Sequence, residues 1–225
     1  MIEIRHLSKS YPTQLGRKYV FRDLNFTMPD SMGVGLLGRN GAGKSTLLRI
    51  LGGIEAPDHG KVITDQSISW PVGLAGGMQG SLSARENVRF ICRVLGATGA
   101  EMREKIDYVE SFAELGEYFD LPLSTYSSGM RARVNFGTSM AFDYDYYLID
   151  EVMAVGDPNF RKKASAVFRE KLSRASVILV SHNMNDIREM CGTVVVVERG
   201  EAVVYKDVKD GIEAYTGALK GAATK

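Results

Sequence analysis

Short runs of consecutive apolar residues recur along this chain and are separated by segments with a helical period. Residues 33–37, 146–149 and 177–180 are continuous apolar runs, which is typical of parallel strands covered on both faces. Residues 193–197 and 202–205 flank a short turn and predict a hairpin near the end of the chain. Because strands and helices alternate, the pattern indicates a layered α/β domain.

The middle of the chain has a helical period without a strand pattern. Ser83 and Glu86 have the spacing of a capping box, and Thr98 with Glu101 repeats that spacing before a second apolar stripe. We therefore expect one domain over residues 1–225, in which a helical lobe is inserted into an α/β lobe. The expected α/β lobe comprises residues 1–82 and 142–205, the helical lobe residues 83–141, and a C-terminal helix and tail residues 206–225, frayed over 221–225.

The composition is that of an ordinary globular protein. The chain is 44% hydrophobic and 24% charged, which argues against disorder. Its net charge of +1 lacks the basic excess of most nucleic-acid-binding proteins, so we expect no nucleic-acid partner. Cys92 and Cys191 have no metal or redox spacing and are interpreted as buried thiols in a reducing compartment.

Neither a signal peptide nor a membrane span is expected. Charged residues interrupt the first five positions, and no apolar stretch approaches the roughly 20 residues that cross a bilayer. We expect a cytoplasmic protein whose role at a membrane, if it has one, comes through a partner.

A glycine-rich segment after the first apolar run matches the phosphate-binding loop G-x-x-x-x-G-K-[ST]. Its glycines let backbone N–H groups converge on an anion, and the following helix adds its N-terminal dipole. Lys44 is expected to contact the β- and γ-phosphates, and Ser45 to ligate Mg²⁺. The candidate cradle is Gly38, Arg39, Asn40, Gly41, Ala42, Gly43, Lys44, Ser45 and the adjoining Thr46.

Two acids follow the apolar run at residues 146–149. A carboxylate at the carboxyl end of a strand can hold Mg²⁺ beside a phosphate-binding loop, and Asp150 has that position. Glu151 is placed to orient or deprotonate an attacking water. The alternative is that the two acids are exposed and only end the strand. The phosphate-binding loop earlier in the chain makes this alternative weaker than the metal and water roles.

Two further motifs have a structural alternative when each is taken alone. Ser127-Ser128-Gly129 opens a helical segment and is either an anion site or an ordinary helix N-cap. His182 ends the run at residues 177–180, where it can contact a γ-phosphate and the attacking water. A lone histidine is more often structural, but the carboxyl end of this strand should face the same crevice.

The order of these motifs resembles the ATP-binding cassette (ABC) family across essentially the whole chain. The resemblance implies an α/β fold of the P-loop (RecA-like) type, with a mostly parallel sheet, N-terminal antiparallel strands and an inserted helical subdomain. It implies ATP and Mg²⁺ as ligands, with hydrolysis in a homodimer whose signature turn, residues 127–129, contacts the γ-phosphate held by the opposite copy. It also implies that Asp157 is the D-loop acid and that Tyr11 stacks on adenine, with Tyr19 and Phe21 as rivals.

Departures from the usual motifs of the family indicate which of its subfamilies this chain resembles. Tyr-Ser-Ser-Gly-Met stands at residues 126–130 in place of Leu-Ser-Gly-Gly-Gln, and Val-Met-Ala-Val-Gly-Asp follows Glu151. With residues 69–71 and 76–82, these resemble the capsular-polysaccharide exporter ATPases. Related O-antigen exporters often carry a sugar-binding domain after the cassette, and we expect this chain to lack one, which favours the capsule type.

The resemblance implies that the protein acts at the cytoplasmic face of the inner membrane, bound to a polytopic permease. Periplasmic export proteins are further implied partners of the complex. Gln79 lies about six residues beyond the usual Q-loop position, which falls near Gly73, so we do not expect it to ligate the metal. Export of another surface glycan, such as O-antigen or teichoic acid, is one alternative. A soluble ABC ATPase outside transport and a P-loop small-molecule kinase are the others.

Overall fold

The computed structural model describes residues 1–30, 33–73, 77–150 and 157–223. The chain divides into two compact units. Unit 1 consists of Met1–Pro71, Tyr144–Val152 and Arg174–Lys225, and unit 2 consists of Val72–Asp143 and Met153–Ser173. Among the described residues, no helix combines the length and the apolar character needed to span a bilayer.

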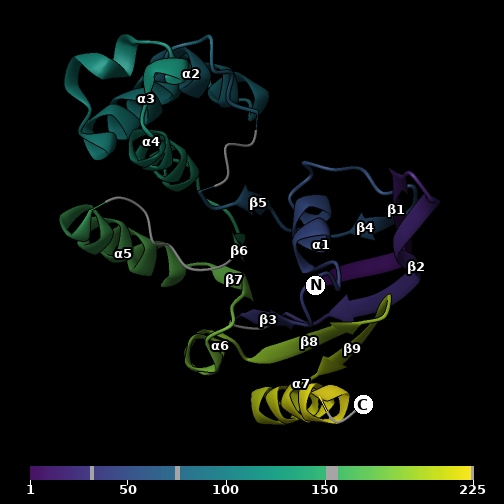
Figure 1. Ribbon diagram of the computed structural model, residues 1–225. Coiled ribbons are helices and arrows are strands. Elements are labelled where there is room, and N and C mark those ends of the chain that lie inside the picture. Colours follow the sequence, from purple (N-terminus) through teal and green to yellow (C-terminus); the bar gives the residue numbers. More distant parts are fainter. Residues whose placement is uncertain (31–32, 74–76, 151–156, 224–225) are drawn as a thin grey trace. The chain divides into compact units, whose positions relative to one another are not determined.

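The described residues of unit 1 form two sheets, whose strands are labelled in Figure 1. The first has the order β2-β1-β4 and is antiparallel, and the second has the order β5-β6-β7-β3-β8-β9 and is parallel except for β9. The strands are β1 (Ile2–Thr13), β2 (Gly16–Met28), β3 (Val34–Leu37), β4 (His59–Ile63), β5 (Ile68–Pro71), β6 (Tyr146–Asp150), β7 (Ser176–Val180), β8 (Thr193–Glu198) and β9 (Glu201–Tyr205). The predicted apolar strands and the terminal hairpin are therefore confirmed, as is the mostly parallel α/β fold.

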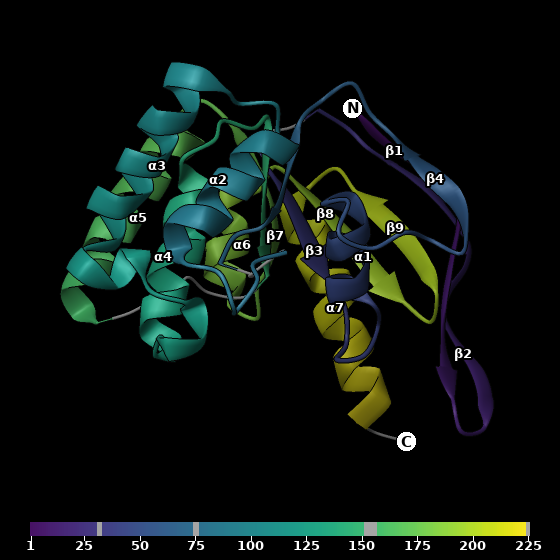
Figure 2. The same ribbon diagram turned by 90° about the horizontal axis from the view of Figure 1, so that it is seen from above.

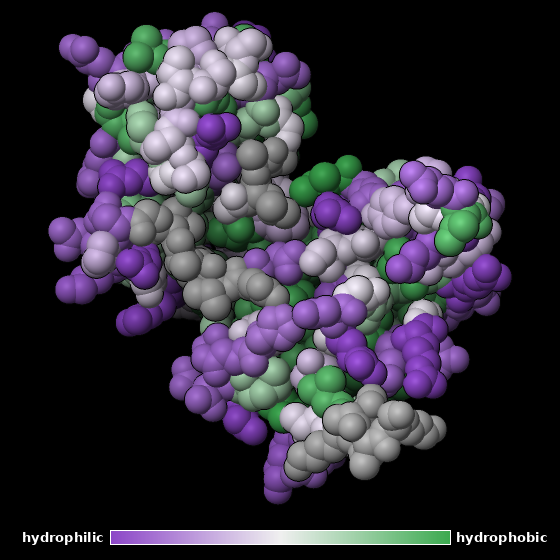
Figure 3. All heavy atoms as spheres, viewed as in Figure 1, coloured by the Kyte–Doolittle hydropathy of each residue, from purple (hydrophilic) through white to green (hydrophobic). Residues whose placement is uncertain are grey.

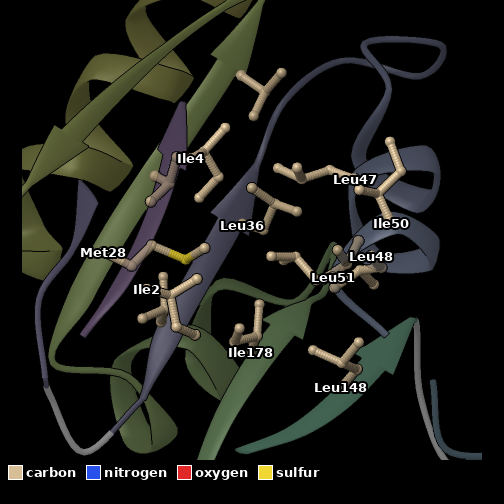
Figure 4. Close-up of a cluster of buried hydrophobic side chains, with 14 of the residues drawn as sticks. Ile2, Ile4, Met28, Leu36, Leu47, Leu48, Ile50, Leu51, Leu148 and Ile178 are labelled. Atoms are coloured by element: carbon tan, nitrogen blue, oxygen red, sulfur yellow. The ribbon is translucent and has the colours of Figure 1, made fainter. Parts of the chain in front are cut away.

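Apolar side chains of both sheets and of α1 (Lys44–Leu51) form the core of unit 1 (Figure 4). All four residues of β3 are buried, as expected of a strand covered on both faces. Two more helices, α6 (Met184–Met190) and α7 (Val208–Ala223), also belong to this unit. Helix α7 extends to Ala223 and therefore includes the first three residues of the segment predicted to fray from Gly221.

Unit 2 is helical. Its helices are α2 (Ala84–Val94), α3 (Gly99–Ala113), α4 (Ser128–Met140) and α5 (Pro158–Leu172), with short 3₁₀ turns at Gly116–Asp120 and Leu123–Thr125. Helices α3, α4 and α5 lie side by side (Figure 2), and Phe112 of α3 contacts the rings of Phe136 on α4 and Phe160 on α5. This aromatic packing attaches α5 to unit 2, although α5 follows β6 in the chain.

The surface of α5 is mostly polar. On the face in Figure 3, hydrophilic residues predominate over this helix. Only Phe160, Ala164 and Phe168 of the helix are buried. Their spacing of four residues gives the narrow apolar stripe of a helix that packs along one side.

The capping box predicted at Ser83 is confirmed. The Ser83 hydroxyl accepts a hydrogen bond from the Glu86 amide, and the Glu86 carboxylate accepts one from the Ser83 amide. Thr98 is the N-cap residue of α3, but the capping box predicted there is wrong, because the Thr98 side chain makes no cap bond. The first helical residue, Gly99, has φ +58°, so the first turn of α3 departs from helical geometry, and Glu101 instead pairs with Lys105.

Replacing Ser83 by alanine is expected to lower the free energy of unfolding by about 1 kcal/mol, because it leaves the Glu86 amide without its acceptor. Urea denaturation followed by circular dichroism measures the change. Thr98→Ala is the matched control, since that side chain makes no cap bond, and its effect should stay within about 0.5 kcal/mol. Equal losses in the two variants would contradict the assigned role of the capping box.

Both cysteines are buried free thiols, as predicted. Burial raises the pKa of the Cys191 thiol to about 12. Burial also raises the pKa of Cys92, so neither thiol has the thiolate character of a reactive cysteine.

Candidate functional site

The glycine-rich loop lies between β3 and α1 in unit 1. Strand β7 pairs in parallel with both β3 and β6, so the carboxyl ends of these three strands lie along one edge of the sheet. Ligands of open α/β sheets bind at that edge. The edge brings the loop after β3, Asp150 at the end of β6 and the end of β7 into one region.

Lys44 is the first residue of α1 and is only 8% exposed to solvent. Its Nζ donates hydrogen bonds to the carbonyl oxygens of Gly38, at 2.8 Å, and of Arg39, at 3.2 Å. The loop therefore wraps around the ammonium group. A phosphate that approaches the loop meets this charge together with the N-terminal dipole of α1.

Two glycines of the loop are required by the packing around them. Gly43 has φ +102°, and a Cβ atom there would lie 2.4 Å from the Val20 side chain. A Cβ atom on Gly38 would lie 2.4 Å from the carbonyl oxygen of Val197 on β8. The loop can follow this close path only because both positions lack a side chain.

A pocket of about 320 Å³ opens beside the loop. It brings together most of the predicted phosphate and metal residues, but Gly38, Arg39 and Ala42 are not in its lining. Val20 of β2 and Val180 of β7 also line it, and the sequence gives no sign of this, since nothing distinguishes these valines from core residues of their strands. The lining residues are Val20, Asn40, Gly41, Gly43, Lys44, Ser45, Thr46, Asp150 and Val180.

The donor set suits Mg²⁺. Ser45 and Asp150 both line the pocket and carry oxygen ligands. Mg²⁺ prefers oxygen and commonly takes only one or two protein ligands, with water and substrate phosphates completing its shell. Glu151, the predicted water-activating residue, lies outside the described residues.

The aromatic candidates for adenine stacking differ in their surroundings. Phe21 is fully buried in the core of unit 1 and so cannot present a face to a ligand. Tyr19 is 43% exposed, with the Arg22 guanidinium 3.9 Å from its ring centre. Tyr11 is half-buried, and its hydroxyl lies 3.4 Å from Oγ1 of Thr46, a pocket residue.

His182 lies just beyond the carboxyl end of β7. His182 is exposed. It lies two positions after Val180, which lines the pocket. The turn around it is fixed by the Ser181 hydroxyl, which accepts a bond from the Asn183 amide at 3.0 Å and donates to Asp186 at 3.1 Å.

The serine-glycine turn opens α4 in unit 2. Ser127 is the N-cap, and its Oγ accepts a bond from the Met130 amide at 3.2 Å. Tyr126, which replaces the usual leucine, is 3% exposed and donates its hydroxyl to the carbonyl oxygen of Tyr118. The turn thus combines an exposed anion-attracting helix N-terminus with a buried anchor.

Asp157 is the N-cap of α5. Its carboxylate accepts bonds from the Phe160 and Asn159 amides and pairs with Arg133 of α4. The Phe160 amide, the Asn159 amide and the Arg133 guanidinium lower the pKa of Asp157, so it remains ionised at neutral pH.

Within unit 2, the turn and Asp157 line one pocket of about 770 Å³. The predicted signature residues and the predicted D-loop acid therefore share a single surface. Its lining consists of Glu114, Leu115, Tyr118, Ser127, Ser128, Gly129, Met130, Ala132, Arg133 and Asp157.

Gln79 is held by its backbone. Its amide donates to Oδ1 of Asn87 at 2.7 Å, and its carbonyl oxygen accepts a bond from Nδ2 of Asn87 at 3.0 Å. Asn87 is 1% exposed, whereas Gln79 is exposed. A buried asparagine thus fixes the loop that presents Gln79.

Comparison with known proteins agrees with this geometry. Residues 21–154 match the ABC transporter family. The chain is 54% identical over 216 residues to the polysialic acid transport ATP-binding protein KpsT of Escherichia coli, covering 96% of each chain. It is 43% identical over 219 residues to the capsule polysaccharide export ATP-binding protein CtrD of Neisseria meningitidis serogroup B, covering 96% of this chain and 98% of that protein.

The fold has solved counterparts. The ATP-binding cassette MJ0796, in a dimeric post-hydrolysis state with ADP and phosphate bound, superposes with a TM-score of 0.69 at 23% identity. The match covers 92% of this chain and 98% of that one. The family match and these relatives show that the chain belongs to the ABC transporter family.

Proposed function

We propose that this chain powers the export of a capsular polysaccharide across the inner membrane by hydrolysing ATP for a partner transmembrane subunit. The observation that carries the proposal is whole-length similarity to ATP-binding proteins of polysialic acid and capsule export. Short matches to the phosphate-binding loop alone would indicate nucleotide binding without indicating export.

The pocket of unit 1 is the proposed ATP-binding half-site. The cradle of residues 38–46 binds the phosphates, and the Lys44 ammonium exchanges its bonds with the Gly38 and Arg39 carbonyls for bonds with phosphate oxygens. Ser45 and Asp150 hold Mg²⁺, which neutralises charge on the β- and γ-phosphates when it is bound. Tyr11 stacks on the adenine.

Hydrolysis requires an activated water near the γ-phosphate. Glu151, which directly follows the pocket residue Asp150, orients this water and accepts its proton. His182 stabilises the γ-phosphate and the attacking water from the end of the neighbouring strand, since β6 and β7 are paired.

A second copy of the chain completes the site. In the proposed sandwich, Ser127, Ser128 and Gly129 of one copy contact the γ-phosphate of the ATP held by the other. The exposed N-terminus of α4 presents amides and a positive dipole to that anion. Asp157, on the same pocket, contacts the opposite copy as the D-loop acid.

The partner that transports the glycan is a polytopic permease, and this places the chain at the cytoplasmic face of the inner membrane. The loop around Gln79 is exposed, yet fixed by the buried Asn87. Because the backbone of this loop is hydrogen-bonded to Asn87 of α2, a movement of α2 would also move the loop and a subunit bound to it. Periplasmic export proteins join the assembly through the permease, and nucleic acid has no part in it.

A pull-down from detergent-solubilised native membranes tests the proposal. The tagged chain is expected to recover a polytopic membrane protein and ATPase activity in one eluate. Recovery of a permease for O-antigen or teichoic acid would mean that the exported glycan is not a capsular polysaccharide. Recovery of a soluble partner alone would refute the role in transport. The Lys44→Ala chain serves as the control for contaminating ATPase activity, because its own ATP binding should be impaired.

A further inference from the structure

Arg133 joins three helices of unit 2. It lies on α4, and its guanidinium pairs with Asp157 at the start of α5. The guanidinium also donates a hydrogen bond, at 3.3 Å, to the carbonyl oxygen of Ala113, which is the last residue of α3. The same guanidinium lies 4.7 Å from the ring centre of Phe160. The side chain is 22% exposed, so these contacts are only partly open to solvent.

Arginine is well suited to this position. Its planar fork can donate toward a carboxylate and a carbonyl together while its flat face lies over an aromatic ring. A cation at the C-terminal end of α3 also complements the helix dipole. The Asp157 carboxylate is then oriented from two sides, by the Asn159 and Phe160 amides of α5 and by Arg133 of α4.

The contacts of Arg133 border the pocket that contains the serine-glycine turn. Arg133 and Asp157 line this pocket together with Ser127 and Gly129. The turn begins the helix that carries Arg133, and Asp157 begins α5. The ion pair therefore connects two segments that would both face the second copy in the proposed dimer.

We propose that Arg133 is a positioning residue for ATP hydrolysis, which holds Asp157 and the serine-glycine turn in one fixed arrangement toward the ATP of the second copy. This inference rests on the proposed function of those two segments in the dimer. Arg133 acts through Asp157 and does not bind ATP in its own copy, where the pocket in unit 1 holds the nucleotide. Its loss therefore affects turnover and dimer closure while leaving the affinity of the single chain for ATP unchanged.

The test compares Arg133→Met with Lys171→Met. Lys171 of α5 is also 22% exposed, and it also makes an ion pair, with Asp143, and a bond to a carbonyl, that of Phe142. Neither Lys171 nor its partners line the pocket. Arg133→Met should lower kcat about tenfold, as expected for the loss of a hydrogen-bonded charge pair, with the Kd of the monomer for ATP within about twofold of wild type. Lys171→Met should keep the wild-type kcat.

Further variants separate positioning from general stability. Arg133→Lys keeps a cation opposite Asp157 and should recover part of the lost kcat. In a double-mutant cycle, Asp157→Asn should add little to Arg133→Met, because both remove the same contact. ATP-dependent dimerisation measured in the Glu151→Gln background should weaken on adding Arg133→Met.

The results that overturn the inference are specific. Wild-type kcat in Arg133→Met, an equal loss in Lys171→Met, or additive losses with Asp157→Asn would each exclude the positioning role. If Arg133→Met does not fold, Arg133→Gln carries the same expectations, since it keeps a donor toward the Ala113 carbonyl. An inactive wild-type chain would instead count against the proposed function as a whole.

Discussion

ATP hydrolysis by the Glu151→Gln variant is expected to fall by at least about a hundredfold, while ATP binding persists. General acid–base catalysis contributes on the order of 10²–10⁴ to a rate, and glutamine retains the size of the side chain without its basicity. The pocket residue Asp150 directly precedes Glu151 and remains to hold the metal. Phosphate release under saturating ATP measures the change.

The same variant should accumulate as a closed dimer. Bound triphosphate bridges the two copies in the proposed mechanism, and without hydrolysis that bridge persists. Size-exclusion chromatography with light scattering, run with and without ATP, should show a dimer only in the presence of ATP. Glu201→Gln, at the exposed start of β9, is the control and should hydrolyse ATP at the wild-type rate. A Glu151→Gln chain that turns over normally would remove Glu151 from the mechanism.

The central strands could be predicted because their surroundings impose a simple rule. A strand that is covered on both faces must be apolar at every position, and β3, the first four residues of β6 and nearly all of β7 are buried. The edge where these strands end was predictable for the same reason, since parallel neighbours align their carboxyl ends. Local chemistry sufficed for the cap at Ser83 and gave the N-cap at Ser127 as one of two alternatives, because such caps depend on residues three positions apart.

Contacts between distant segments were not predictable in this way. Arg133 and Asp157 are 24 positions apart, and nothing in either local sequence indicates that they meet. At Thr98 the local pattern predicted a contact that is absent. The spacing of a capping box is present there, but Gly99 has a positive φ and the Thr98 side chain makes no cap bond. Among the aromatic candidates, Phe21 could be set aside only once its burial was known, since an aromatic residue in a strand is as consistent with core packing as with stacking.

Replacing Lys44 by alanine is expected to weaken ATP binding by about 1.5–3 kcal/mol, the usual range for hydrogen bonds to a charged group. That range corresponds to roughly a tenfold to hundredfold rise in Kd. The effect should be large because the ammonium is nearly buried at the centre of the loop, where water screens its charge poorly. Isothermal titration calorimetry with ATP measures the affinity directly.

A matched lysine separates this local effect from a change in overall charge. Lys61 lies on β4 in the same unit and is exposed, so Lys61→Ala removes one positive charge away from the pocket lining. Its Kd for ATP should remain within about twofold of wild type, because exposed charges interact weakly across a salt solution. Unchanged ATP binding in Lys44→Ala would contradict the proposed cradle, whereas equal losses in both variants would indicate long-range attraction in place of direct contact with the phosphates.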